Sequence, residues 1–212
     1  MPARPPPPAL LLLSSQCPHC PAVLAGLVDL LKRAVIGRLE AINVQADPQA
    51  AAELGVRTVP WLRLGPFELT GPLTPVELET WARRASSPDG MADAFHDFLK
   101  AGDAAQVLRR VDEEPGRLAA LLPIVANPEA SLNVRLGAGM VLEEHAGGAA
   151  LRALVPGLCQ LSRHGDARVR ADAAHFLGLA RDPSARPCLE ALRADADPDV
   201  REIAGEGLEA SA

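Results

Sequence analysis

The stretch that decides the first fold prediction is Ala9–Ala34, ALLLLSSQCPHCPAVLAGLVDLLKRA. Its apolar beginning predicts a short buried strand at Ala9–Ser15, and Pro21–Ala34 has the apolar spacing of an amphipathic helix. The motif Cys17-Pro18-His19-Cys20 stands where the strand gives way to the helix. One sulfur is therefore expected at the helix N-terminus, where unpaired N–H groups favour a negative charge.

This cysteine pair predicts thiol–disulfide exchange. A cysteine in such a motif can have its pKa lowered from about 8.5 into the range of roughly 3.5 to 7.5, so much of it is thiolate at neutral pH. We expect Cys17 to attack a substrate disulfide and Cys20 to resolve the mixed disulfide. His19 lies beside them in the sequence, and a positive charge on its imidazole would stabilise the thiolate.

The alternatives for the pair are a structural zinc site or an idle remnant of the fold. Structural zinc needs four ligands in compatible positions. Beyond Cys17, Cys20 and His19, residues 1–87 contain no further Cys or His. The sequence therefore predicts no metal site.

The rest of the first half alternates between short strands and helices. Asp47 can cap a helix that begins at Pro48 and stops at Gly55, and Thr74 with Glu77 has the pattern of a capping box. The predicted order is βαβαββα, an α/β fold. The elements after the first helix are a strand at Gly37–Val44, the helix from Pro48, strands at Val59–Leu64 and Phe67–Thr70 joined across Gly65-Pro66, and a helix at Pro75–Ala85.

That order, the cysteine motif after the first strand, and Thr58-Val59-Pro60 before the third resemble the thioredoxin/glutaredoxin superfamily over residues 9–85. The resemblance implies a cis Val59-Pro60 bond against the cysteine pair, with an extended substrate held by the backbone of Val59. It implies that Pro18, His19, Val59 and Pro60 bind substrate.

The resemblance also bears on the cofactor. The redox-active disulfide Cys17–Cys20 is itself the working group, so no separate cofactor is predicted. Gln16 stands where thioredoxins carry Trp. Of the glutathione-binding pattern of glutaredoxins we find only Thr70-Gly71, so glutathione is left open without support.

A composition change at Ser86–Gly90 predicts a domain boundary, with one domain at residues 1–87 and a second at residues 88–212. Beyond the boundary the apolar spacing is helical, for example at Leu118, Leu121, Leu122 and Val125 and again at Leu151, Leu154, Val155 and Leu158.

The second domain repeats itself. The pairs Val134-Arg135, Val169-Arg170 and Val200-Arg201 are each followed by small or apolar residues at the same spacing, and the offsets are about 35 and 31 residues. Three residues before each Val stands a capping residue, namely Ser131, Asp166 or Asp197. The pattern resembles short HEAT-like repeats, which implies an all-α solenoid of helix pairs that recruits a protein client. Gly90–Asn127 is then a diverged first repeat or cap.

Several conspicuous side chains are expected to stabilise the fold rather than to bind a ligand. Cys159 and Cys188 stand in apolar helical stretches, and we interpret them as small core residues. Trp61 and Trp81 are expected in the core. The three repeated Arg residues are expected to form a solvated ladder with nearby Asp residues between repeats, rather than a ligand site.

Composition limits the class of partner. Residues 1–87 carry eight Lys or Arg and seven Asp or Glu, whereas residues 88–212 carry thirteen and twenty. Neither part has a basic stripe with interleaved aromatics, so nucleic acid is not expected as a partner. No apolar run is long enough to cross a membrane, and the N-terminal run is too short for a signal peptide, so a cytoplasmic location is predicted.

Two functions follow from these patterns. The first is a thiol–disulfide oxidoreductase whose helical repeats recruit a protein client, and which needs a thiol or disulfide reductant or oxidant to recycle the Cys17–Cys20 pair. The alternative is a non-enzymatic adaptor or redox sensor in which the thioredoxin-like part is a scaffold.

Overall fold

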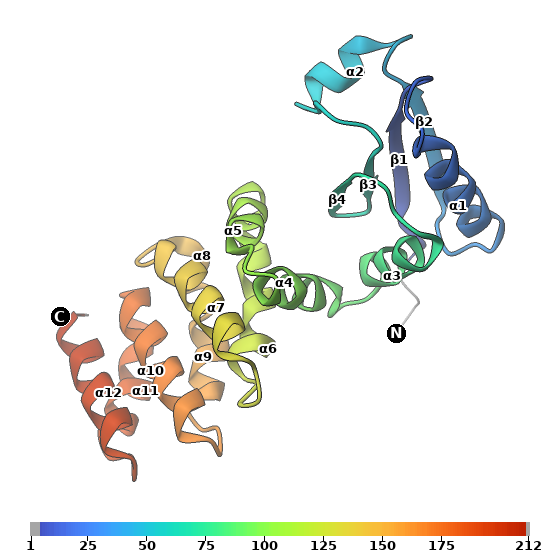
Figure 1. Ribbon diagram of the computed structural model, residues 1–212. Coiled ribbons are helices and arrows are strands. Elements are labelled where there is room, and N and C mark those ends of the chain that lie inside the picture. Colours follow the sequence, from blue (N-terminus) through green and yellow to red (C-terminus); the bar gives the residue numbers. More distant parts are fainter. Residues whose placement is uncertain (1–4, 211–212) are drawn as a thin grey trace. The chain divides into compact units, whose positions relative to one another are not determined.

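The computed structural model describes residues 5–210, and Figure 1 labels their helices and strands. The chain divides into two compact units, with the boundary between Met91 and Ala92. The first unit has the predicted order βαβαββα. Its elements are β1 (Pro8–Leu13), α1 (Cys20–Lys32), β2 (Arg38–Asn43), α2 (Pro48–Glu53), β3 (Trp61–Leu64), β4 (Phe67–Thr70) and α3 (Pro75–Ser86).

The four strands form one mixed sheet in the order β2-β1-β3-β4. The strand β1 is parallel to β2 and antiparallel to β3, and β3 forms the expected antiparallel hairpin with β4. β1 ends at Leu13, two residues before the predicted end at Ser15. The reason is a turn in which the Cys17 N–H donates to the carbonyl oxygen of Ser14 at 3.3 Å, so the chain leaves the sheet there.

Alternate side chains of the sheet build the core of the first unit. Leu11, Leu62 and Leu64 share one face of the sheet and cluster with Leu27 of α1 and Leu78 of α3, all at most 1 % exposed. Because successive strand residues point to opposite faces, Trp61 lies on the other face, paired in register with Leu12.

The two tryptophans differ in burial. Trp61 is 5 % exposed, as expected of a core residue, and the Arg63 guanidinium lies 5.2 Å from its ring. Trp81 is only half-buried, with its ring 5.0 Å from that of Phe67.

Local signals in the sequence place the helices of this unit. The Asp47 carboxylate accepts from the Ala50 N–H at 3.2 Å, and Thr74 with Glu77 forms the predicted capping box, in which Glu77 reaches back to the Thr74 N–H at 2.7 Å. The helix α1 ends at Lys32, and Ala34 then adopts φ 56°, the left-handed conformation that commonly closes a helix.

The second unit is helical in its described part. Its elements are α4 (Gly90–Lys100, whose first residues precede the boundary), α5 (Ala104–Glu113), the 3₁₀ segment η1 (Pro115–Leu121), α6 (Leu122–Val125), α7 (Leu132–Glu144), α8 (Ala149–Arg152), α9 (Val155–Leu161), α10 (Ala167–Ala180), the 3₁₀ segment η2 (Pro183–Ala185), α11 (Arg186–Leu192) and α12 (Pro198–Ala210). Figure 1 shows the later helices of this unit stacked side by side.

The repeats pair a long helix with a broken one. The long helices are α7, α10 and α12, and the second helices α6, α9 and α11 are short segments, each preceded by η1, α8 or η2. Each second helix has a proline in its first turn, Pro123, Pro156 or Pro187, which removes a backbone donor and interrupts the preceding turn. Leu118, Leu121 and Val125 are buried as their spacing predicts, but η1 and α6 share this face in place of one continuous helix.

The repeated valines and alanines are buried as their spacing predicts. Val134, Val169 and Val200 are at most 2 % exposed, and the matching Ala138, Ala173 and Ala204 are at most 1 % exposed.

Only two of the three predicted capping residues form a capping hydrogen bond. Asp166 and Asp197 accept backbone N–H groups at the starts of α10 and α12, whereas the Ser131 side chain makes no capping hydrogen bond.

The closest contact between long helices joins α10 and α12. A Cβ atom added to Gly178 would lie 2.6 Å from the Cα of Gly207, far inside ordinary contact. Both positions therefore need glycine for the two backbones to approach.

Within residues 5–210, no helix combines the length and apolar character that a membrane span requires.

Candidate functional site

The predicted cysteine pair lies at the junction of β1 and α1. Cys17 follows the turn after β1, and Cys20 is the first residue of α1. The two residues form a disulfide, with their Cα atoms 5.5 Å apart. The sequence placed this junction correctly, although the helix begins at Cys20 rather than Pro21.

The two sulfurs are not equally accessible. Cys20 is 2 % exposed, whereas Cys17 is half-buried, and the intervening Pro18 and His19 are exposed. Because Cys17 is more exposed than Cys20, an incoming partner reaches Cys17 before Cys20. This is the arrangement that an attacking and a resolving cysteine require.

Backbone dipoles act on the accessible sulfur. The Cys20 N–H donates to the Cys17 Sγ at 3.1 Å, at the first residue of the 13-residue helix α1. His19 is the N-cap residue, and its side chain makes no capping hydrogen bond. The Cys17 sulfur therefore takes the place of a side-chain cap, and a helix N-terminus favours a negatively charged group there.

The segment before β3 approaches the same sulfur from the other side. The Val59-Pro60 peptide bond is cis, as the resemblance implied. The carbonyl oxygen of Val59 lies 3.8 Å from Cys17 Sγ, across 42 residues of sequence. Pro60 is buried and Val59 is half-buried. The structure thus brings Cys17, Cys20 and Val59 together, with Pro18 and His19 on the exposed rim.

The interpretation of the other two cysteines as small core residues is wrong. Cys159 of α9 and Cys188 of α11 form a disulfide, with Cα atoms 5.7 Å apart, and both are half-buried rather than core residues. The sequence did hold a signal. The two cysteines are separated by 29 residues, close to the repeat offset, and so fall on second helices of successive repeats.

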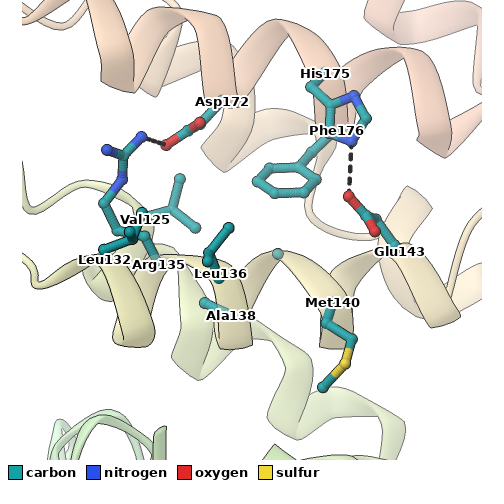
Figure 2. A pocket seen from close by; sticks show the side chains of 11 residues that line it. Val125, Leu132, Arg135, Leu136, Ala138, Met140, Glu143, Asp172, His175 and Phe176 are labelled. Atoms are coloured by element: carbon teal, nitrogen blue, oxygen red, sulfur yellow. Dashed lines mark hydrogen bonds and ion pairs between the residues drawn. The ribbon is translucent and has the colours of Figure 1, made fainter. Parts of the chain in front are cut away.

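A groove between α7 and α10 is a second candidate site, which the sequence analysis missed. It has a volume of about 280 Å³, and Figure 2 shows the Phe176 ring between two polar pairs. In these pairs Arg135 donates to Asp172 at 2.8 Å, and His175 Nε2 lies 3.1 Å from Glu143.

One wall of this groove is apolar and open. Leu132, Leu136 and Met140 are 67 %, 64 % and 48 % exposed and follow one another at every fourth residue of α7. Figure 2 shows Met140 extending away from α10, so the apolar stripe continues beyond the groove. The four-residue spacing of these apolar residues could have predicted the stripe from the sequence, although they are not part of the repeated core pattern.

Two of the repeated arginines join neighbouring repeats through Asp residues as predicted, Arg135 through Asp172 and Arg170 through Asp195, but the second pair is largely buried rather than solvated. Arg170 makes two 2.8 Å hydrogen bonds to Asp195, and only 16 % and 10 % of these side chains are exposed. The hydrogen bonds from Arg170 lower the pKa of Asp195, and those to Asp195 raise the pKa of Arg170. Arg201 binds the carbonyl oxygens of Asp195 and Ala196, so the two arginines hold one loop between them.

The described residues offer no candidate metal site. Among residues 5–210, no group of three or more His, Cys, Asp or Glu is placed to hold a metal ion.

Residues 118–209 match the family model of HEAT repeats. The match runs from within η1 through most of α12, which is somewhat less than half of the chain. The HEAT-like segment therefore contains both the α7–α10 groove and the Cys159–Cys188 disulfide. HEAT repeats suggest a role in protein interaction. A search of curated proteins finds no match to the chain.

Proposed function

We propose that the protein is a thiol–disulfide oxidoreductase of the thioredoxin/glutaredoxin type, and that Cys17 is its nucleophile. The observation that carries the proposal is the position of Cys17 Sγ, which receives the Cys20 N–H at the start of α1 and lies 3.8 Å from the Val59 carbonyl oxygen. The half-buried Cys17 beside a buried Cys20 supports the division into attacking and resolving residues.

The proposed reaction begins with both cysteines reduced. The Cys17 thiolate attacks one sulfur of a substrate disulfide, and the other substrate sulfur leaves as a thiolate that takes up a proton. Cys20 then loses its proton and attacks Cys17 Sγ, which releases the second substrate sulfur. The substrate disulfide becomes two thiols, and two electrons and two protons pass from the pair to the substrate. An oxidising partner drives the same steps in reverse.

The surroundings of the pair support a protein substrate in extended conformation. Val59 lies beside the reactive sulfur in the segment just before β3, and an extended chain can pair with the backbone of such a segment. His19 and Pro18 form the exposed rim that a substrate meets first. In the predicted cytoplasmic location, a low-molecular-weight thiol or a reducing protein would return the pair to its dithiol form.

The test compares disulfide reduction by the protein and by its Cys17→Ser variant, with insulin as substrate and dithiothreitol as the terminal reductant. We expect catalysed reduction that the variant loses, and a Cys20→Ser variant that accumulates a mixed disulfide at Cys17. A Cys159→Ser/Cys188→Ser variant is the matched control and should keep the activity. An unperturbed Cys17 pKa near 8.5 by alkylation rate, together with no catalysis, would reject the proposal.

A second candidate function, protein binding by the HEAT-like segment, is supported by the open stripe on α7. Leu132, Leu136 and Met140 offer an apolar strip of the length of two helical turns, which suits the apolar face of a helix. The rim carries Glu143 and Asp172, which already contact His175 and Arg135, and residues 88–212 as a whole have twenty acidic against thirteen basic residues. The partner that fits is therefore a basic amphipathic helix of a client protein.

Binding is tested with a fluorescent model peptide of Leu and Lys in helical spacing, and with the same peptide carrying Glu for Lys. We expect the lysine peptide to bind, and a Leu136→Ser/Met140→Ser variant to bind about tenfold more weakly. Val76→Ser is the matched control, because Val76 is an exposed apolar residue on α3 of the first unit. Equal binding of both peptides, or an equal loss in the control, would count against this surface.

A further inference from the structure

The Cys159–Cys188 disulfide connects the second helices of two successive repeats. Cys159 lies on α9 and Cys188 on α11, which are the second helices of successive repeats. Both helices pack against α10. The covalent bond therefore ties the end of the HEAT-like segment, α11 and α12, to the repeat before it.

The surface beside this disulfide is hollowed next to Cys188. A hollow of about 310 Å³ is lined by Cys188 but not by Cys159, with Ser162 and Arg163 on one wall and Ala191 on another. Both sulfur-bearing residues are half-buried, so the bond is near solvent. Of the two cysteines, Cys188 is the one that lines the hollow, so a thiol that enters the hollow is placed beside Cys188.

The hollow also carries a positive charge. Arg163 is exposed and makes no ion pair with any carboxylate of residues 5–210. The acidic residue of the hollow, Asp195, is already engaged by Arg170. Arg163 is thus available to stabilise a thiolate, and a low thiol pKa is what makes a sulfur both a populated nucleophile and a good leaving group.

We propose that Cys159–Cys188 is a second redox site, at which a thiolate attacks Cys188 Sγ and thereby releases the last repeat. The S–S bond breaks, the incoming sulfur bonds to Cys188, and Cys159 leaves as a thiolate that takes up a proton. A second thiol attacks the incoming sulfur and frees Cys188. Two thiols are oxidised to one disulfide, and the inter-repeat disulfide is reduced to two thiols.

The attacking thiolate can come from two sources. One is a low-molecular-weight thiol such as glutathione, and the other is the Cys17–Cys20 dithiol of a second copy of the chain. The glutathione arm does not depend on the proposed oxidoreductase function. The dithiol arm does, because it makes the last repeat a substrate of the first unit. The two arms therefore separate failure of this site from failure of the Cys17–Cys20 pair.

The experiment uses a full-length Cys17→Ser/Cys20→Ser protein, oxidised and folded, as the acceptor. In one arm it is exposed to graded ratios of glutathione to glutathione disulfide, and in the other to the reduced Cys159→Ser/Cys188→Ser protein. Trapping by alkylation and peptide mass analysis gives the state of each cysteine. Opening under native conditions in either arm, with the glutathione adduct at Cys188, supports the proposal. A bond that opens only in denaturant, or an adduct at Cys159, overturns it.

A charge-reversal variant tests the role of the hollow. Arg163→Glu should slow opening by glutathione by about threefold to tenfold, because it replaces a charge that stabilises thiolates with one that repels them. Arg109→Glu on α5 is the matched control, since Arg109 is also exposed and lies outside the hollow. Equal slowing by both variants would show a general charge effect and overturn the assignment of the hollow.

Hydrogen exchange tests the consequence for the repeats. Opening the bond should speed amide exchange in α11 and α12 by about tenfold or more, because the bond no longer restrains their local opening, while α7 should keep its rate. Unchanged exchange in α11 and α12 after opening would overturn the claim that the bond controls the last repeat.

Discussion

The glycine contact between α10 and α12 allows a prediction of opposite sign for two similar substitutions. In Gly178→Ala the new Cβ would lie 2.6 Å from the Cα of Gly207, about 1 Å closer than two carbon atoms settle. Neither atom belongs to a flexible side chain, so the helices themselves must move apart. In Gly205→Ala, on α12 itself, the new Cβ meets nothing within 4 Å.

The size of each effect follows from packing and helix propensity. Overpacking costs typically about 1–3 kcal/mol, and replacing a helical glycine with alanine returns up to about 1 kcal/mol. Gly178→Ala should therefore lower the free energy of unfolding by about 1–2 kcal/mol. Gly205→Ala should raise it by about 0.5–1 kcal/mol, since only the propensity term acts.

Urea unfolding followed by circular dichroism at 222 nm measures both variants against the parent protein. With a urea dependence of roughly 2 kcal/mol per molar, the two midpoints should differ by about 1 M, one below and one above the parent. A midpoint for Gly178→Ala equal to or above that of Gly205→Ala would refute the reasoning, because it would mean that α10 and α12 are not in backbone contact.

Three further outcomes are expected. The first concerns Asp195, whose pKa in the folded protein is lower than its usual value of 3.8. Near pH 3.8 this carboxyl therefore binds fewer protons in the folded protein than in the unfolded chain. Its contribution to stability is present above that pH and is lost as the pH falls through the pKa of the folded state. Asp195→Asn should thus flatten the fall in melting temperature between about pH 5 and pH 3, and an unchanged slope would contradict it. Ala34→Gly should raise the free energy of unfolding by about 0.5–1 kcal/mol, since Ala34 has φ 56°, and a loss of stability in urea unfolding would argue against that conformation. Thr74→Ala should cost about 1 kcal/mol through the lost capping box, with Thr80→Ala as an exposed control on the same helix.

The order of elements in the first unit was predicted correctly because the signals that set it are local. The apolar run, the cysteine spacing and the capping residues Asp47 and Thr74 each act within a few residues. The end of β1 was misplaced because a turn hydrogen bond at Ser14 decided it. The prolines of the second helices, such as Pro156, were readable too, but the apolar spacing around them masked the breaks they cause.

The two disulfides show the limit of local reasoning most clearly. Cys17 and Cys20 are three residues apart, so the first turn of one helix brings them together whatever the rest of the chain does. Cys159 and Cys188 were interpreted as separate core residues, and only the stacking of α9 and α11 on α10 places their sulfurs side by side.

By itself the sequence determined the order of helices and strands in the first unit, that the second half repeats, and that a cysteine pair stands at a helix start, because hydrogen bonding and side-chain periodicity act over short stretches. The tertiary structure decided that Val59 meets Cys17, that Arg170 reaches Asp195, and that an apolar stripe on α7 stays open beside α10. These contacts join residues tens of positions apart. Their geometry depends on how whole elements pack, which no local pattern contains.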